Sequence, residues 1–304
     1  MSRIHDALRR AELERASQAA RTDVKELAGL ITDTIPSDVV DKRNSDLPVL
    51  PNRESEVRGV LSFEALAKRC AHPSWRIDPQ MSVFEGGETG NAGAERFRTL
   101  RSRLYQVART KQFRRVLITS SAPAEGKSFV AANLAQSFAR GHDCRVLLID
   151  ADMRISRLHV ALGVPKIPGL TNYLRGETDE ISVIQIDAQK GFGFIPAGEA
   201  VADPSELILG GRMKNLLDLV TPAFDWVILD SPPALAVHDA SLLADLCDGV
   251  LFVVKAGETS DGDAVKASSE FQGKNLLGVV LNQVEKADLY EDYYYSGEHS
   301  GEKK

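Results

Sequence analysis

The sequence has few cysteines, no long apolar run and no excess of basic residues, and each shortage excludes a class of protein. The three cysteines among 304 residues, Cys70, Cys144 and Cys247, are widely spaced and form no C-x-x-C pair, which argues against a disulfide framework or a zinc site. The longest apolar runs, such as 250–254 and 276–281, are far shorter than the roughly 18–20 residues of a membrane-spanning helix. The net charge of -6 is not that of a nucleic-acid coat or a polybasic membrane binder.

What is present is typical of a globular protein with a sizeable core. Hydrophobic residues make up 43% of the chain and charged residues 26%. The charged amino terminus has no apolar core of a signal peptide. We therefore expect a cytoplasmic protein without a direct membrane span, so that any role at a membrane would depend on a partner. Four of the six tyrosines lie in the last fifteen residues, which is unusual for such a composition.

The chain divides into four segments. Residues 1–30 predict an N-terminal helix whose thin apolar stripe either docks on another surface or leaves a solvated helix. Residues 31–90 predict a linker and partly ordered region, with several prolines and a glycine-rich stretch at 85–90. Residues 91–285 form the main domain, and 286–304 form a tyrosine-rich tail that is expected to be flexible.

Apolar runs of strand length alternate with segments of helical periodicity in the main domain. Runs that predict strands cover 115–119, 145–149, 192–195, 226–229, 249–255 and 278–284. Segments that predict helices cover 129–140, 204–220, 238–246 and 262–272. Strands that are apolar throughout and alternate with helices are typical of an α/β fold, a mostly parallel sheet with helices on both faces. Ligands of such sheets bind at the carboxyl ends of the strands.

A phosphate-binding loop is predicted between the first strand and the first helix of this pattern. The segment 116–128 ends in Gly-Lys-Ser, although Ser121 stands where the strict pattern has its first glycine. Backbone N–H groups at a helix start can cradle phosphates, the lysine can reach the β- and γ-phosphate oxygens, and the serine can bind Mg²⁺. The expected nucleotide-binding residues are Ala124, Glu125, Gly126, Lys127, Ser128 and Phe129. The sequence thus predicts a P-loop NTPase fold.

Carboxylates follow two of the predicted strands. Asp150 and Asp152 come directly after one buried strand, and Asp230 ends another. A single aspartate at such a position is commonly a helix cap or turn residue. Three of them beside a Gly-Lys-Ser loop indicate a Mg–nucleotide site, because a hard cation prefers oxygen ligands.

These motifs resemble those of the bacterial tyrosine kinases, which act in capsular and exopolysaccharide synthesis and export. The resemblance rests on the loop S-x-x-P-x-E-G-K-S ending at Ser128, on D-x-D-x-R over 150–154 and on D-S-P-P over 230–233. The ParA/MinD-like switch ATPases share the fold, but their signature lysine would stand at Ala122 here. They also give no reason for a tyrosine cluster at the carboxyl end.

The resemblance implies an ATP- and Mg²⁺-dependent protein-tyrosine autokinase of the stand-alone type. Lys127 would neutralise phosphate charge, and Ser128 with Asp152 and Asp230 would hold Mg²⁺. Asp150 would orient the incoming hydroxyl and accept its proton. Asn282 would contact the adenine, or it is a buried structural amide.

The resemblance also assigns acceptors and partners. The expected phosphoacceptors are Tyr290, Tyr293, Tyr294 and Tyr295, phosphorylated between subunits. Glu95, Arg98 and Arg101 match an E-x-x-R-x-x-R subunit-contact motif, although the same spacing suits an intrahelical ion pair. Expected partners are a second copy, a membrane-embedded polysaccharide chain-length or export protein and a phosphotyrosine phosphatase, but no nucleic acid. The alternative is a ParA/MinD-like positioning or scaffold ATPase without tyrosine transfer.

Overall fold

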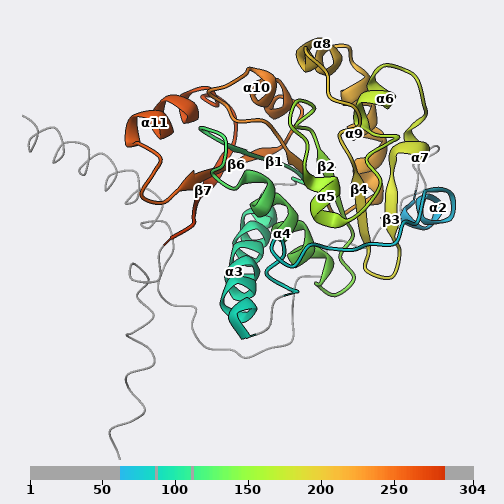
Figure 1. Cartoon of the computed structure of the whole chain (residues 1–304), viewed down its shortest axis with the longest axis horizontal. Coiled ribbons are helices and arrows are strands. Elements are labelled where there is room, and N and C mark those ends of the chain that lie inside the picture. The colour runs from blue at the N-terminus through green and yellow to red at the C-terminus, as the bar shows by residue number, and fades with distance from the viewer. Residues whose placement is uncertain (1–61, 86–87, 111–112, 285–304) are drawn as a thin grey trace, which may run out of the picture. The chain divides into compact units, whose positions relative to one another are not determined.

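A computed structural model describes residues 62–85, 88–110 and 113–284. The predicted N-terminal helix over 1–30 and the tyrosine-rich tail over 286–304 lie outside these ranges. Within the described part, a seven-stranded sheet runs through the centre, with helices on both faces (Figure 1).

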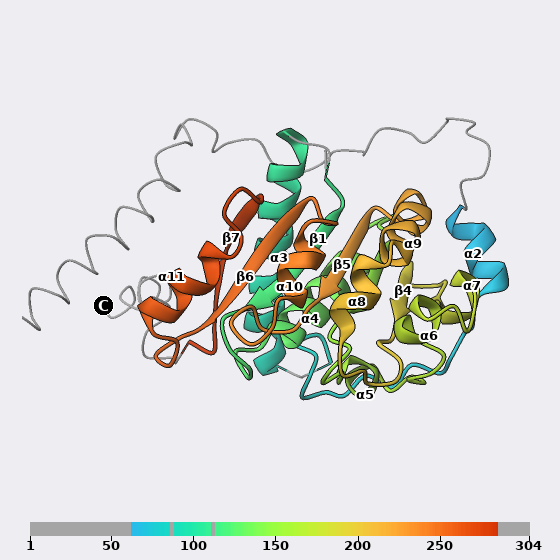
Figure 2. The same cartoon turned by 90° about the horizontal axis from the view of Figure 1, so that it is seen from above.

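The strands of this sheet have the spatial order β3-β4-β2-β5-β1-β6-β7. Their bounds are β1 (Arg115–Ser120), β2 (Val146–Asp150), β3 (Gln185–Asp187), β4 (Phe192–Ile195), β5 (Trp226–Asp230), β6 (Gly249–Lys255) and β7 (Leu276–Asn282). All neighbours pair in parallel except β3 and β4, which are antiparallel. Figure 2 shows the strands side by side from β7 at one edge to β4 near the other. The parallel sheet predicted from the sequence is thereby confirmed.

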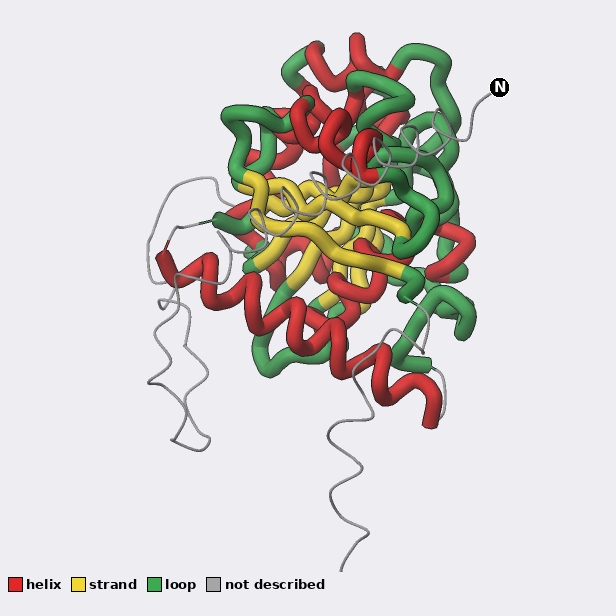
Figure 3. Tube along the Cα trace, turned by 90° about the vertical axis from the view of Figure 1, so that its left-hand side faces the viewer, coloured by secondary structure: helices red, strands yellow, loops and turns green. Residues whose placement is uncertain are grey.

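The helices form a layer on each side of the sheet (Figure 3). They are α2 (Phe63–Arg69), α3 (Glu88–Thr110), α4 (Lys127–Ala139), α5 (Leu158–Leu162), α6 (Leu170–Leu174), α7 (Glu180–Val183), α8 (Pro204–Leu209), α9 (Arg212–Val220), the 3₁₀ helix η1 (Thr221–Ala223), α10 (Asp239–Ala244) and α11 (Asp261–Ser269). Helices α3, α4 and α5 pack in one core, and the others contribute to the opposite one. In the described ranges, no helix combines the length and apolar character needed to cross a bilayer.

Alternate residues of the central strands enter the two cores. Leu117 and Leu147 belong to one core, whereas Ile118 and Leu148 belong to the other, and all four are fully buried. Because successive strand side chains point to opposite faces, a strand that is covered on both faces must be apolar at every position. This requirement explains the continuous apolar runs in the sequence.

The structure differs from the predicted elements in several places, and the short helices α5, α6 and α7 are among the elements that the sequence did not predict. The short antiparallel strand β3 carries too little apolar sequence to be recognised alone. The single helix expected over 204–220 is two helices, α8 and α9, because Gly211 adopts a φ of 80° between them and the left-handed region interrupts a helix. The stretch 85–90 is not a linker throughout, since α3 begins at Glu88. Packing of the long α3 against α4 outweighs the low helix propensity of the glycines there.

The packed domain also begins earlier than the predicted boundary at residue 91. Helix α2 buries Phe63 and Leu66 in the core, and Ala71 pairs with Gln185 of β3. Both ring nitrogens of His72 lie within hydrogen-bond distance of backbone carbonyls, 2.9 Å from Ile186 O and 2.6 Å from Ala67 O. Residues 62–85 are therefore part of the domain. Their own sequence does not show this, because the residues that they contact are distant in the chain.

Candidate active site

The loop between β1 and α4 has the backbone of a phosphate-binding loop. It ends at Gly126, whose φ of 94° lies in the left-handed region, directly before the first residue of α4, Lys127. Ala124 also has a positive φ, of 65°, which is uncommon for a residue with a Cβ. The free N–H groups and the positive dipole end of α4 begin at this turn, and both favour an anion. The strand–loop–helix arrangement expected from the sequence is confirmed.

Side chains from distant segments hold this loop in place. Glu125 is buried, with 4% of its surface exposed, and its carboxylate accepts a hydrogen bond from the Ala122 N–H at 2.8 Å and another from the Thr259 hydroxyl. Asn282, half-buried at the end of β7, donates its side-chain amide to the Glu125 carbonyl at 2.9 Å. Asn282 therefore positions the phosphate loop, and its contact with adenine stays a prediction.

Two carboxylates meet at the carboxyl edge of the sheet. The register of β2 and β5 pairs Asp150 directly with Asp230, each the last residue of its strand. Both side chains are buried, and each has one oxygen, Oδ1, without a hydrogen-bond partner among the described residues. Burial raises the pKa of both carboxyls well above the usual range, and the neighbouring Asp230 raises that of Asp150 further.

Lys127 supplies the positive charge that offsets these carboxylates. Its Nζ lies 3.2 Å from Oδ2 of Asp152, and both side chains are mostly buried. Burial lowers the pKa of Lys127, but the carboxylates of Asp230 and Asp152 outweigh burial and raise it, so the lysine is charged. The Lys127 charge and a hydrogen bond from Ser128 in turn lower the pKa of Asp230 against the effect of burial. The structure thus brings together all the residues that the sequence predicted for catalysis and metal binding.

Asp150 is held by one of its two oxygens. Its Oδ2 accepts hydrogen bonds from the Ser156 hydroxyl at 2.8 Å and from the Leu158 N–H at 3.3 Å. The Ser156 hydroxyl also lies 3.3 Å from Nδ1 of His159. These contacts fix the orientation of the carboxylate and leave the buried Oδ1 without a hydrogen-bond partner among the described residues.

Replacing Asp150 by asparagine is expected to stabilise the nucleotide-free protein. The unfolded chain holds an ordinary aspartate, charged above about pH 4, whereas the folded protein raises its pKa. The wild type therefore loses stability as the pH rises from the unfolded pKa towards the folded one, and Asp150→Asn avoids this loss. At pH 7 we expect a gain of about 1–3 kcal/mol in the free energy of unfolding, shrinking towards pH 4.

Urea unfolding at pH 4.5, 6 and 7.5 would measure this effect. Asp261→Asn is the matched control, since Asp261 is exposed at the start of α11 and its replacement is expected to change stability by less than about 0.5 kcal/mol. A loss of stability in Asp150→Asn at every pH would contradict the expectation.

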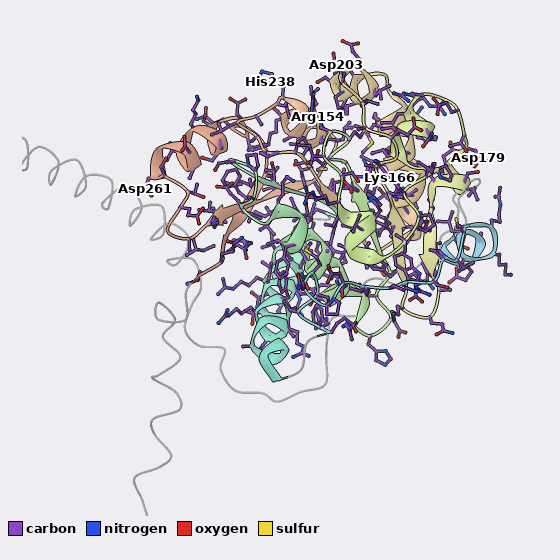
Figure 4. The ribbon with its side chains drawn as sticks, in the orientation of Figure 1. Arg154, Lys166, Asp179, Asp203, His238 and Asp261 are labelled. Atoms are coloured by element: carbon purple, nitrogen blue, oxygen red, sulfur yellow. The ribbon has the colours of Figure 1, made fainter. Side chains whose placement is uncertain are left out.

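An ion pair anchors the segment that carries Asp152. Arg154 donates to both carboxylate oxygens of Asp239, with Nε–Oδ2 at 2.8 Å and Nη2–Oδ1 at 3.2 Å. It also donates to the Ala202 carbonyl at 2.8 Å, and Ser205 donates to Asp239 at 2.7 Å. Figure 4 shows Arg154 near α8 and α10, which carry Ser205 and Asp239. Because Asp152 accepts from the backbone N–H of Arg154 at 3.3 Å, the pair positions the carboxylate that faces Lys127.

Arg154→Met is expected to destabilise the protein by about 2 kcal/mol, because it leaves the buried Asp239 carboxylate without its cation. The value is below that of a fully buried pair since the Arg154 side chain is 29% exposed. Arg175→Met is the matched control, because the Arg175 ion pairs are longer, at 3.8 and 3.9 Å, and more exposed; its removal should change stability by at most about 1 kcal/mol. Equal losses in the free energy of unfolding for the two replacements would show that the Arg154–Asp239 ion pair does not anchor the segment that carries Asp152.

The residues of the site fit a magnesium–nucleotide complex. The unpartnered oxygen of Asp230 and the Ser128 hydroxyl are hard donors of the kind Mg²⁺ binds. Among the residues that the structure describes, no three His, Cys, Asp or Glu side chains are grouped so that they could hold a metal by themselves. The expected three carboxylates therefore do not form a protein cage. Mg²⁺ is commonly held by one or two carboxylates together with phosphate oxygens and water, so the donor set suits it only with the nucleotide present.

The predicted subunit-contact residues on α3 make contacts within the chain. Arg98 pairs with Glu95 at 2.8 Å on the exposed helix surface, as the intrahelical interpretation of the spacing expects. Arg101 donates to the backbone carbonyl of Ser137 near the end of α4. The subunit contact stays a prediction, with Glu95 and Arg98 as its exposed members and Arg101 already engaged inside the domain.

The remaining predicted residues divide into two groups. Phe129 lies in the first turn of α4, and its ring packs edge-on against Phe97 of α3, with centroids 6.1 Å apart; any nucleotide contact would thus come from its backbone. The four phosphoacceptor tyrosines, Tyr290 and Tyr293 to Tyr295, lie outside the described residues.

Sequence reasoning missed the residues that support the site from a distance. Thr259 and Asp239 are ordinary polar residues at the start of helices in sequence, and Ser156 lies in a short loop. None of them carries a motif. Their roles follow from hydrogen bonds to Glu125, Arg154 and Asp150, which only the folded chain brings near.

Comparison with known proteins supports the nucleotide site. A family model described as the CobQ/CobB/MinD/ParA nucleotide binding domain matches residues 116–298. Tyrosine-protein kinase YwqD of Bacillus subtilis is 34% identical over 220 residues, which are 72% of this chain and 92% of that protein. Tyrosine-protein kinase wzc of Salmonella typhimurium is 32% identical over 229 residues, but the chain spans only 32% of its length.

Two solved structures are also similar to this chain. The kinase domain of Escherichia coli tyrosine kinase ETK is 29% identical, with a TM-score of 0.65 over 76% of this chain and 92% of that one. The chimerical protein CapA2B2 is 32% identical, with a TM-score of 0.60 over 63% of this chain and 85% of that one.

Proposed function

Because the chain belongs to the bacterial tyrosine kinase family, we propose that it transfers the γ-phosphoryl group of ATP to tyrosines of its own C-terminal tail. The proposed acceptors are Tyr290, Tyr293, Tyr294 and Tyr295, and the proposed transfer runs between subunits. The modification would regulate exopolysaccharide or capsule synthesis or export. The observation that carries the proposal is a buried strand-end carboxylate, Asp150, with one free oxygen beside the phosphate loop and Lys127.

Each residue of the site has a part in this reaction. Lys127 would leave Asp152 for the β- and γ-phosphate oxygens, and the N–H groups at the start of α4 would bind the phosphates. Mg²⁺, held by Ser128 with Asp152 and Asp230, would supply charge neutralisation of the phosphates. Asp150 would receive the tyrosine hydroxyl on its free Oδ1 while Ser156 holds its Oδ2 in place.

Asp150 matters less as a base than as a positioning group. A carboxylate of ordinary pKa is a weak base towards a phenol of pKa about 10, although burial raises the pKa of Asp150 and narrows this gap. Phosphoryl transfer is largely dissociative, so the proton can leave late and charge neutralisation carries most of the rate. Loss of Lys127 should therefore cost more activity than loss of Asp150.

The geometry allows a tail to reach the site from its own subunit as well as from a neighbour. Strand β7 ends at the same edge of the sheet as β2, four strand positions away, which is roughly 19 Å. Tyr290 and Tyr295 are 8 and 13 residues past the end of β7, and an extended chain of these lengths spans roughly 26 and 43 Å. The transfer between subunits that we propose thus predicts a phosphorylation rate per molecule that rises with protein concentration, whereas transfer within a subunit would be independent of it.

Intact-mass measurement after incubation with Mg–ATP tests the proposal. Added masses of one to four phosphates in the wild type, and none when all four tail tyrosines are replaced by phenylalanine, are expected. A tenfold dilution series then distinguishes transfer between subunits from transfer within one. Absence of added phosphate in the wild type, with and without a candidate membrane partner, would overturn the proposal.

A second function is a positioning or scaffold ATPase, which the family model favours because it includes MinD and ParA. Such a protein would release free phosphate from ATP without a mass change in the tail. A phosphate-release assay on the same samples separates the two. The relatives named tyrosine-protein kinase favour the first function.

The proposed partners follow from the same family. A membrane-embedded polysaccharide chain-length or export protein would recruit the kinase to the inner face of the membrane, and a phosphotyrosine phosphatase would reset the tail. Co-purification of the chain with membranes only when the partner is co-expressed would support recruitment.

A further inference from the structure

The segment that follows β2 differs in charge from the rest of the chain. Residues 153–176 contain no aspartate or glutamate but four basic residues, although the whole chain carries a net charge of -6. Arg154 and Arg175 are engaged in ion pairs. In the part of the chain that the structure describes, Arg157 and Lys166 form no ion pair, and Arg157 is exposed. Two cationic side chains are therefore available at this surface.

The same segment exposes three large aliphatic side chains. Ile155 is 70% exposed, Val160 66% and Ile167 55%. They alternate in sequence with the two available cations, Arg157 and Lys166. An exposed surface that combines apolar and cationic side chains suits a ligand that is both aromatic and acidic, because rings contact the aliphatic groups and carboxylates face the cations.

The segment that carries this surface also contacts the buried candidate catalytic carboxylate, Asp150. The segment begins three residues after Asp150, and Ser156 links it to that carboxylate through a 2.8 Å hydrogen bond. Helix α5 follows and carries Val160 (Figure 1). Lys166 lies close enough to His159 of this helix to lower the pKa of that imidazole together with burial, and Figure 4 labels it beside α5. A peptide lying on this surface would be next to Asp150.

We propose that residues 154–167 form a docking surface for the phosphoacceptor segment 289–295 of the tail. That segment reads Leu-Tyr-Glu-Asp-Tyr-Tyr-Tyr, so it combines four aromatic rings with two adjacent carboxylates. Its composition complements the surface, with Glu291 and Asp292 for the cations and the leucine and tyrosines for the aliphatic side chains. The inference rests on the proposed function and adds to it the residues that select the acceptor.

Docking of this kind depends on charge and on apolar contact together. Attraction between partly exposed charges weakens with salt, because the Debye length falls from about 10 Å at 0.1 M to about 3 Å at 1 M. Substrate selection by docking changes the rate of tail phosphorylation without changing the binding of ATP. These two consequences distinguish a docking surface from a part of the nucleotide site.

The first experiment compares surface variants of the full chain. Arg157→Glu combined with Ile155→Ser should slow phosphate incorporation into the tail at least about fivefold, the effect of roughly 1 kcal/mol, while the Kd for a fluorescent ADP analogue stays unchanged. The matched control, Lys266→Glu with Val265→Ser, places the same changes on α11, where Val265 is 63% exposed. Rates equal to wild type in the first variant would overturn the docking surface.

A charge exchange makes the test specific. Replacing Glu291 and Asp292 by arginine should slow tail phosphorylation in a chain with the wild-type surface. In a chain that also carries Arg157→Glu, the same replacement should restore part of the rate. No restoration would contradict direct contact between these groups. Salt should slow wild-type tail phosphorylation more than that of the surface variant.

Binding measured without catalysis separates this inference from the proposed function. A fluorescein-labelled peptide of residues 285–304 should bind full-length Lys127→Met, and adding Arg157→Glu should weaken that binding. If the wild type shows no phosphate in the tail but the peptide binds in this way, the proposed function fails and the docking surface stands. If binding of phosphatidylserine vesicles is lost in the surface variant while peptide binding is unchanged, the surface serves a membrane and the docking proposal is wrong.

Discussion

Full-length Lys127→Met is expected to incorporate no measurable phosphate into the tail, a loss of at least about 100-fold in rate. Lys127 is the only lysine of the phosphate loop, and the carboxylates of Asp230 and Asp152 keep it charged. Because phosphoryl transfer depends on neutralising the β- and γ-phosphate oxygens, an uncharged side chain of similar length removes the main contribution of the protein to the rate. Intact-mass spectrometry over a time course measures the loss.

The replacement also removes the cation that Asp152 and Asp230 face, so stability needs a separate control. Lys127→Arg keeps the charge near the carboxylates while changing the shape of the phosphate contact, and it should lose most of the activity but little stability. Lys190→Met removes an exposed lysine that pairs with Asp187 at 3.3 Å and should change neither property. Phosphate incorporation in a folded Lys127→Met equal to wild type would remove Lys127 from the mechanism.

Gly126→Ala is expected to raise the Kd for nucleotide by roughly 30–150-fold. Gly126 has a φ of 94°, and a Cβ at this position would lie 2.0 Å from Nδ2 of Asn282. The asparagine would have to move, which breaks its hydrogen bond to the Glu125 carbonyl, and the residue would be strained. Strain and the lost hydrogen bond together cost about 2–3 kcal/mol. The loop would relax to another conformation, and nucleotide binding would have to restore the original one.

Two further glycines make matched controls. Gly211 and Gly273 have φ values of 80° and 81°, and a Cβ at either position would meet nothing within 4 Å. Alanine there introduces the same backbone strain without displacing a side chain, so stability should fall slightly and nucleotide binding should not change. Titration with a fluorescent ADP analogue measures each Kd. Similar values for Gly126→Ala and both controls would show that the close contact with Asn282 has no effect on the loop.

Adding Asn282→Ala to Gly126→Ala separates strain from crowding. The second replacement removes the atom that the new Cβ would meet, so part of the affinity should return. Asn282→Ala alone should weaken nucleotide binding modestly, because the Glu125 carbonyl loses its donor. No recovery in the double variant would assign the whole effect to backbone strain at residue 126.

The phosphate loop and the strand-end carboxylates were predictable because they depend on neighbours within a few residues. A Gly-Lys-Ser triplet between an apolar strand and a helix is typical of a phosphate-binding loop. Asp150 and Asp230 each end an apolar run, and parallel strands place their carboxyl ends at one edge. The sheet was predictable for the same reason, except β3, which is three residues long and gains its order from pairing with β4.

The contacts of the predicted residues were less predictable than their positions. Asn282 was expected to contact the adenine or to be a buried structural amide; in the structure it donates to a loop carbonyl, and the adenine contact stays a prediction. Arg101 was expected at a subunit contact, and it donates to the end of α4. In both cases the residue type allowed several partners, and packing selected one of them.

The sequence by itself determined the order of strands and helices along the chain, the phosphate loop and the set of acidic residues near it, because apolar periodicity and local motifs encode them. Only the tertiary structure decided that Asp150 lies beside Asp230, that Thr259 and Asn282 hold Glu125, and that Arg154 pairs with Asp239. The last three contacts join residues 134, 157 and 85 positions apart in the chain. Contacts over such separations depend on how the strands are ordered in the sheet, and local sequence carries no record of that order.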